Sequence, residues 1–276
     1  MVRSGFTCKF RSIFGNAVLG TARMTERATL AGLSLFSGGP ESLLRLVLDK
    51  AQSGDALCVH FISANSVWQA EKDPEFRELL SSGGLLAPDS RWVEWCSRLT
   101  GPKAVQTRGP RIFEEALTLT QGFQLKHFFV GPNKEVNFAL ARALEDRFPV
   151  LSIGDFLEAP FSPFDAVDMD ALVEAIECEE PSIVWLGIGT PAQDILAVEL
   201  TRRTNCVVLA VGAAFEFLAG LKPEAPATVS RLGFEWLYRL LAEPGRLWRR
   251  YLIGNVVFLR AVTKHWVVAK KATRRN

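Results

Sequence analysis

Asp89 is the residue of this sequence best placed to act as a general base. It follows Pro88 in the run LLAPDSRWV, at the expected end of a strand. A carboxylate there can lie beside a bound hydroxyl group and remove its proton as that oxygen forms a new bond. Asp is also a preferred N-cap residue, so the same position can instead start the helix that follows. On residue type alone, the cap is the commoner outcome.

Gln193 stands in the first turn of a predicted helix, directly after the apolar run VWLGIG. The free N–H groups and the dipole of a helix start can hold a phosphate or a sugar oxygen, and an amide side chain adds directional hydrogen bonds. The plainer alternative is a polar residue exposed to solvent. The run GIGTPAQ lacks the third glycine of a dinucleotide fingerprint, so a nicotinamide enzyme is not predicted.

Other polar or small residues follow two further strands. Ser63 and Asn65 come just after ALCVHFIS and can either line the same crevice as Gln193 or start a helix. Gly212 can let the backbone approach a nucleotide closely, and Glu216 can face its ribose or base.

Arginines gather near the C-terminus among large aromatic residues. Guanidinium groups match phosphate oxygens in a two-pronged fork, so these arginines are candidates for contact with a diphosphate or a lipid headgroup. A mixture of basic and aromatic side chains also favours a lipid interface, although a charge cluster is more often a solvated face. The arginines are Arg239, Arg246, Arg249 and Arg250, and the aromatic residues are Trp236, Tyr238, Trp248, Tyr251 and Trp266.

No metal ion or other cofactor is predicted. The three histidines, His60, His127 and His265, are far apart and form no ligand pattern. The run Asp168–Asp170 superficially resembles the Asp-x-Asp element of metal-dependent sugar transferases, but it precedes ALVEAIE and fits a helix start with acidic first-turn residues.

The elements around these residues predict an α/β fold with a Rossmann-like, mostly parallel sheet and flanking helices. Several strands end in Gly and run into polar residues, and in open α/β sheets the carboxyl ends of the strands hold ligands. A helix is expected to end at Gly54, and another to be interrupted near Pro74. Strands are expected at ALCVHFIS, LKHFFVG, VLSIG, SIVWLGIG and CVVLAVG, and further helices near 134–146, 169–177 and 192–202.

Composition divides the chain into three parts. Residues 1–30 read as a variable N-terminal extension, 31–221 as the Rossmann-like core, and 222–276 as a basic amphipathic appendage. The appendage has 12 Lys and Arg against 3 Asp and Glu, whereas residues 1–221 have 20 against 27. A basic module on an acidic body favours a polyanionic partner: nucleic acid, anionic lipid or diphosphate.

Size, cysteine spacing and hydropathy indicate what class of protein this chain is. The 276 residues, 48% of them hydrophobic, can bury one large core. The five cysteines are widely spaced, which favours a reducing compartment. No uncharged apolar run reaches the roughly 20 residues of a spanning helix, so we do not expect the chain to cross a bilayer.

Pro244 suits a helix start, and the spacing of Trp248, Leu252, Val256 and Leu259 predicts one shared apolar face.

The C-terminal stretch VGAAFEFLAG, a short spacer and LGFEWLYRLLAEPGRLWRRYL resemble the closing signature of the WecG/TagA/CpsF family of bacterial glycosyltransferases. The segments FISANSVWQA, LLAPDSRWV and WLGIGTPAQD fall in the expected order, and the similarity spans Leu33 to Leu259. The resemblance implies an inverting transfer of a hexose or N-acetylhexosamine-type sugar from a UDP-sugar to a polyprenyl-diphosphate-linked acceptor, in surface polysaccharide biosynthesis. It implies a cytoplasmic protein, peripheral on the inner face of the bacterial plasma membrane.

The same resemblance assigns roles and shows departures. The proposed base of the family matches Asp89, its pocket glutamine matches Gln193, and a usual Thr is Ser63. Ala192 replaces a usual Lys and Glu224 a usual Arg, while Asp194 and Glu216 exchange one acidic residue for the other. The two missing basic groups imply a different donor, an altered acceptor or weaker activity.

Two other hypotheses stay open at this point. One is a catalytically degenerate homologue that binds a sugar nucleotide without turnover. The other makes the basic tail a nucleic-acid contact and the acidic body a regulatory module, although the large apolar residues of the tail would then be exposed. The leading expectation is therefore a UDP-sugar donor, a lipid-linked acceptor and an anionic membrane as partners, and no nucleic acid.

Overall fold

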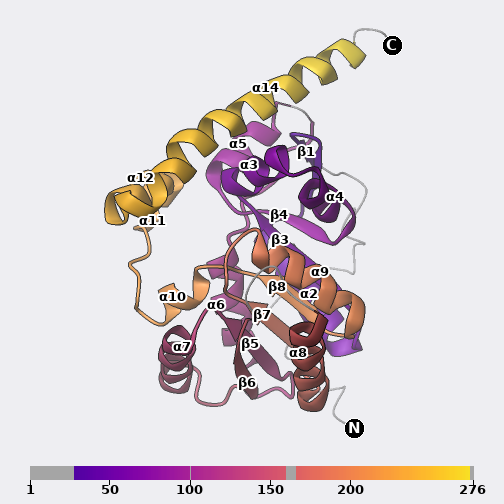
Figure 1. Ribbon diagram of the computed structural model, residues 1–276, viewed down its shortest axis with the longest axis vertical. Coiled ribbons are helices and arrows are strands. Elements are labelled where there is room, and N and C mark those ends of the chain that lie inside the picture. Colours follow the sequence, from indigo (N-terminus) through magenta and orange to yellow (C-terminus); the bar gives the residue numbers. More distant parts are fainter. Residues whose placement is uncertain (1–27, 100, 160–165, 274–276) are drawn as a thin grey trace.

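The protein folds around one twisted eight-stranded sheet with helices on both sides (Figure 1). The computed structural model describes residues 28–99, 101–159 and 166–273. The strands are β1 (Ala28–Leu30), β2 (Leu33–Leu35), β3 (Leu57–Ile62), β4 (Leu85–Pro88), β5 (His127–Gly131), β6 (Ile153–Glu158), β7 (Ile183–Leu186) and β8 (Val207–Ala210).

The sheet order is β1-β2-β4-β3-β8-β7-β5-β6, and every neighbouring pair is parallel except β1 with β2. The expected Rossmann-like, mostly parallel sheet is confirmed. Because β4, β3, β8 and β7 are parallel neighbours, their carboxyl ends meet at one edge of the sheet. The loops that carry the candidate residues start there.

Successive side chains of a strand point to opposite faces of the sheet, so each strand packs against a different set of helices on each face. In β7, Ile183 and Trp185 pack with α2 (Gly39–Ser53), α6 (Gly109–Thr120), α7 (Lys134–Arg147) and α10 (Ala214–Leu218). Val184 and Leu186 point the other way and pack with α8 (Ala166–Glu179) and α9 (Ala192–Arg203). Both faces are therefore covered, which is why these strands read as continuously apolar.

Most of the predicted elements are present, with corrections at the edges of the sheet. α2 ends at Gly54, whose φ of 71° suits glycine. Asp73 separates α3 (Ala64–Lys72) from α4 (Pro74–Ser82). The prediction of a strand at VLSIG is wrong in its bounds, because β6 begins only at Ile153 and continues to Glu158. β1 lies within the stretch expected as an extension, of which residues 1–27 fall outside the described part.

The C-terminal part is a chain of helices laid across one end of the sheet (Figure 1). It contains α11 (Ala227–Arg231), α12 (Glu235–Ala242), α13 (Pro244–Trp248), a π-helical turn η1 (Arg249–Ile253) and α14 (Gly254–Thr273). The predicted helix start at Pro244 is confirmed. Phe258, Ala261 and Val262 are buried in a core shared with β1, β2, α3, α4 and α5 (Arg91–Ser97). This shared core fixes α14 to the sheet domain.

One side of the helix that runs through α13, η1 and α14 is apolar and exposed. Trp248, Leu252, Val256 and Leu259 are 44%, 55%, 57% and 46% exposed. By length and composition alone, Pro244–Lys271 is long and apolar enough to cross a membrane, whereas the sequence predicts no spanning segment. Because the opposite side of α14 is packed on the domain, inserting the helix upright would expose that core face.

Candidate active site

A cavity of about 250 Å³ lies at the carboxyl ends of the central strands. It is lined by Ser63 after β3, Asp89 after β4, Gln193 in the first turn of α9 after β7, and Gly212 after β8. These loops converge because their strands are parallel neighbours. The sheet therefore brings together residues that are far apart in the sequence.

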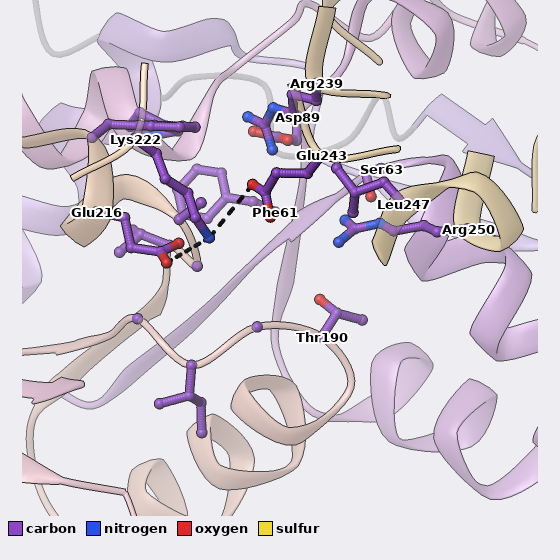
Figure 2. A pocket seen from close by; sticks show the side chains of 18 of the residues that line it. Phe61, Ser63, Asp89, Thr190, Glu216, Lys222, Arg239, Glu243, Leu247 and Arg250 are labelled. Carbon is purple, nitrogen blue, oxygen red and sulfur yellow. Dashed lines mark ion pairs between the residues drawn. The ribbon is translucent and has the colours of Figure 1, made fainter. Parts of the chain in front are cut away.

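The opposite wall comes from the C-terminal helices. Arg239 of α12 and Arg250 of η1 reach the cavity beside Asp89 and Ser63 (Figure 2). Arg246 of α13 also lines it. The cavity thus has two walls. The basic wall consists of Arg239, Arg246 and Arg250, and the facing loop wall contains the Asp89 carboxylate.

Lys222 joins the two walls. Its Nζ lies 2.6 Å from Glu216 Oε1 on α10 and 3.7 Å from Glu243 Oε1 (Figure 2). Glu243 also pairs with Arg246 at 2.6 Å. Glu216 lines the cavity and its carboxylate pairs with Lys222, so its contact with a ribose or base stays a prediction. This chain of ion pairs fastens the C-terminal helices over the cavity.

Two predicted residues lie elsewhere. Asn65 is buried and lines a smaller neighbouring cavity of about 90 Å³. Arg249 is exposed, and its guanidinium lies 5.1 Å from the ring centre of Trp248. It is not one of the described residues that line the two cavities. Of the two adjacent arginines, only Arg250 faces the site.

Asp89 does not cap the helix that follows it. Ser90 is that N-cap, and its hydroxyl accepts a hydrogen bond from the Val93 amide at 3.3 Å. The Asp89 backbone amide donates to the Ile62 carbonyl at 2.9 Å, and its Oδ1 accepts from the Gly109 amide at 2.9 Å. The carboxylate is therefore fixed at the cavity wall by a backbone donor from the start of α6.

The surroundings of Asp89 favour proton uptake. Burial and the nearby Glu235 raise the pKa of its carboxyl group, against the Gly109 amide and the guanidinium groups of Arg108 and Arg239, which lower it. A carboxylate with a raised pKa is a stronger base than an exposed one, as a general base requires.

Gln193 is buried and its amide is held by the backbone. Its Oε1 accepts from the Gly189 amide and its Nε2 donates to the Ala210 carbonyl, both at 2.9 Å. A Cβ on Gly212 would lie 3.3 Å from Gln193 Oε1. Gln193 is therefore not an exposed first-turn residue. It lines the cavity and its amide has a second N–H, so its contact with a phosphate or a sugar oxygen stays a prediction. Gln193 clamps the loop after β7 to the end of β8, and so shapes the floor of the cavity.

Ser63 combines the two roles that the sequence left open. It is the N-cap residue of α3, its amide donating to Ser66 Oγ at 3.2 Å, and it also lines the main cavity. Its cap position holds the hydroxyl close to the end of β3.

The basic wall is only partly neutralised. Within this wall, Arg239 pairs with Glu235 and Arg246 pairs with Glu243. Arg108, which precedes α6 and is not part of the wall, pairs with Glu224 at 2.8 Å and Glu235 at 3.3 Å. Burial lowers the pKa of Arg250, and the neighbouring Arg239 and Arg246 add to that effect against Tyr251 and Asp89. A guanidinium stays charged, so the lowered pKa shows a positive charge in need of an anion. A diphosphate in the cavity would supply one.

Sequence reasoning missed Arg108, Glu235 and Lys222 as part of this site. Gly109-Pro110 signals the helix start after Arg108, but nothing nearby links that arginine to Asp89 or to Glu224. Arg108 supplies a positive charge beside Glu224, the position where the resemblance expected an arginine. Ala192, the other departure, is not among the residues that line the cavity in the described part of the chain.

We expect full activity in the presence of a chelator such as EDTA. Arg239, Arg246 and Arg250 already bring positive charge to the cavity, and within the described residues no group of three or more His, Cys, Asp or Glu could hold a metal. Asp170 of the DMD run is paired with Arg203 on the α8 and α9 side of the sheet. Loss of turnover in EDTA, restored by Mg²⁺ or Mn²⁺, would contradict this prediction.

Comparison with known proteins gives one family. The sequence profile described as Glycosyl transferase WecG/TagA/CpsF family matches residues 28–272. A relative from Bacillus spizizenii is 28% identical over 201 residues, which cover 72% of this chain and 75% of the relative. One from Staphylococcus aureus strain MRSA252 is 28% identical over 224 residues, covering 80% and 85%. Both are named N-acetylglucosaminyldiphosphoundecaprenol N-acetyl-beta-D-mannosaminyltransferase.

Proposed function

The chain belongs to the WecG/TagA/CpsF family of glycosyl transferases, and we propose that it moves a hexose or N-acetylhexosamine from a UDP-sugar to a polyprenyl-diphosphate-linked sugar. The relatives are named for an acceptor in which N-acetylglucosamine is joined through a diphosphate to undecaprenol. The product would enter the biosynthesis of a surface polysaccharide.

The reaction follows from the site as a single displacement. Asp89 takes the proton of an acceptor hydroxyl as its oxygen bonds to the anomeric carbon of the donor. The bond from that carbon to the nucleotide diphosphate breaks, and the diphosphate leaves with the electron pair. One displacement inverts the configuration at the anomeric carbon, as the β linkage in the relatives' names would require of an α-linked donor. Arg239 and Arg250 stabilise the charge that develops on the diphosphate.

One observation carries this proposal. Asp89, with its raised pKa, lies on the wall of the same cavity as Arg239 and Arg250, at the carboxyl ends of the parallel strands. Transfer from a diphosphate leaving group to a hydroxyl needs a base beside guanidinium groups, and Arg250 has no ion-pair partner among the described residues, whereas Arg239 pairs with Glu235.

The test is an assay of purified full-length protein with a panel of UDP-sugars and N-acetylglucosaminyl diphosphate on a short prenyl chain. UDP release and the mass of the lipid product are followed together. We expect a disaccharide product with at least one donor. Binding of UDP without turnover on any acceptor would instead indicate a homologue that has lost catalysis.

We further propose that the protein works as a peripheral protein on the cytoplasmic face of the plasma membrane. The exposed row Trp248, Leu252, Val256 and Leu259 lies on the helix that closes the cavity, and Arg249 and Arg260 flank it. Apolar side chains between basic groups suit an interface of anionic lipid. A lipid-linked acceptor would then meet the protein at the edge of its active site.

We expect the triple change Leu252→Ser, Val256→Ser and Leu259→Ser to weaken sedimentation with phosphatidylglycerol vesicles by about tenfold or more, because three half-exposed apolar side chains lose their lipid contact. Phe138→Ser is the matched control, since Phe138 is 67% exposed on α7, away from α14. Equal vesicle binding by the triple variant and the control would contradict the docking proposal, and binding of wild type to duplex DNA in preference to vesicles would favour a nucleic-acid partner.

A further inference from the structure

The smaller cavity shares a wall with the main one. Five residues line both, and the rest of the smaller cavity is formed by the start of α3, the start of α5, Gln106 in the loop before α6, and the C-terminal helices. The shared residues are Ser63, Asp89, Arg239, Arg250 and Tyr251. Asp89 therefore stands between two spaces of different size, about 250 Å³ and about 90 Å³.

Three residues lining the smaller cavity have buried nitrogen donors without a hydrogen-bond partner among the described residues. They are Arg91 Nε, Trp236 Nε1 and Arg250 Nε. A buried donor without an acceptor costs roughly 1–3 kcal/mol, so such groups in a cavity point to a ligand that brings oxygen atoms. Arg91 is held in place by Glu94, with Nη1 2.5 Å from Oε2, which leaves Nε as the atom that needs an acceptor.

The remaining lining suits a neutral sugar ring. Asn65, Gln106 and Asn255 bring amide groups that can donate to and accept from hydroxyl groups. Trp92 and Trp236 supply large apolar surfaces, and Trp92 is fixed by a hydrogen bond from its Nε1 to the Gly233 carbonyl at 2.9 Å. Amides and indole surfaces match the polar rim and the apolar face of a pyranose.

The position of the cavity indicates which substrate enters it. Asn255 lines it, and the next residue, Val256, belongs to the exposed apolar row of the C-terminal helices. A sugar carried on a membrane lipid would arrive from that side. The larger cavity lies over the loops after β7 and β8, where an α/β sheet holds a nucleotide.

We infer that the smaller cavity is the subsite for the sugar ring of the lipid-linked acceptor. Its attacking hydroxyl faces Asp89 through the shared wall, and Trp236 Nε1 and Arg91 Nε donate to other oxygens of the ring. This assignment rests on the proposed transferase function and adds to it the place and the contacts of the second substrate.

The test compares two substitutions that each remove one donor from an aromatic residue. Trp236→Phe removes the indole N–H of the smaller cavity, whereas Tyr238→Phe removes a hydroxyl that lines only the larger one. Asn255→Ala is a second, independent probe of the smaller cavity. Initial rates give KM for each substrate, and calorimetry gives Kd for UDP and, separately, for short-chain N-acetylglucosaminyl diphosphate.

We expect Trp236→Phe and Asn255→Ala to raise the KM and Kd for the acceptor by about three- to tenfold, the effect of one lost hydrogen bond, with the Kd for UDP unchanged. Tyr238→Phe should leave the acceptor Kd unchanged. Acceptor Kd values equal to wild type in both probes, or a change in UDP affinity instead, would overturn the subsite. If the wild type binds the acceptor but transfers nothing, and both probes weaken that binding, the transferase proposal fails while the subsite stands.

Discussion

Asp89→Asn lowers kcat for sugar transfer by about 10²- to 10⁴-fold, the range that a positioned general base contributes. The Asn carbonyl oxygen can still accept the hydrogen bond from the Gly109 amide, so the loop after β4 keeps its position. The Kd for UDP should stay close to that of wild type, because Arg239, Arg246 and Arg250 of the basic wall are unchanged. The measurement is single-turnover transfer at saturating donor and acceptor, with UDP binding by calorimetry beside it.

The same variant tests the environment of Asp89 through pH. Its carboxyl pKa is raised above the ordinary 3.8, so the ionised form is disfavoured in the folded state. The stability that this group contributes is present below the unfolded pKa and is lost as the pH rises through the folded pKa. Asn cannot ionise and has no such loss. We therefore expect the Tm of Asp89→Asn, relative to wild type, to rise as the pH is increased above the ordinary carboxyl pKa of 3.8.

Asp170→Asn is the matched control, since it makes the same chemical change in a residue paired with Arg203 on α9. It should keep full kcat. A normal rate in Asp89→Asn would remove the base from the mechanism. A large loss in Asp170→Asn would instead favour the Asp-x-Asp interpretation of residues 168–170.

The convergence of Ser63, Asp89 and Gln193 could be predicted from the sequence because it follows from one rule. Each follows an apolar run that ends in polar residues or glycine, and parallel strands bring such ends to one edge of the sheet. Their roles in transfer stay predictions, and the substitutions described here test them.

The contacts that finish the site could not be predicted in the same way. Gln193 looks like an exposed first-turn residue until the end of β8 is placed against it, because its partners, Gly189 and Ala210, belong to two different strand ends. β1 and β2 span only Ala28–Leu30 and Leu33–Leu35, which is too short for a period-two pattern to be read. The pairing of Arg108 with Glu224 depends on the path of the linker after α10.

The sequence does not decide which C-terminal arginine faces the cavity, for a related reason. Arg249 and Arg250 are neighbours on a helix, so one of them points about 100° away from the other. The π-helical turn Arg249–Ile253 widens the helix at this place, and such turns are common at functional sites. Sequence periodicity assumes a regular helix and cannot locate that turn. Only the folded chain distinguishes the arginine of the cavity from that of the surface.

Arg250→Ala lowers kcat/KM with a soluble short-chain acceptor by about 10²- to 10³-fold, whereas Arg249→Ala leaves it within about twofold. Arg250 lines both cavities and carries a poorly compensated charge, so its loss removes stabilisation of the leaving diphosphate, for which about 3–4 kcal/mol is typical of one donor. Arg250→Lys should recover only part of the rate, because an ammonium group lacks the two-pronged geometry.

The adjacent arginine supplies the control and a second measurement. Arg249 is exposed beside Trp248, so Arg249→Ala should weaken binding to phosphatidylglycerol vesicles while Arg250→Ala does not. The two substitutions remove the same charge from consecutive positions, so net charge and helix propensity cannot explain different outcomes. Equal losses of turnover in both variants with soluble substrates would show that the basic helix acts by its overall charge, and the assignment of Arg250 to the diphosphate would then be wrong.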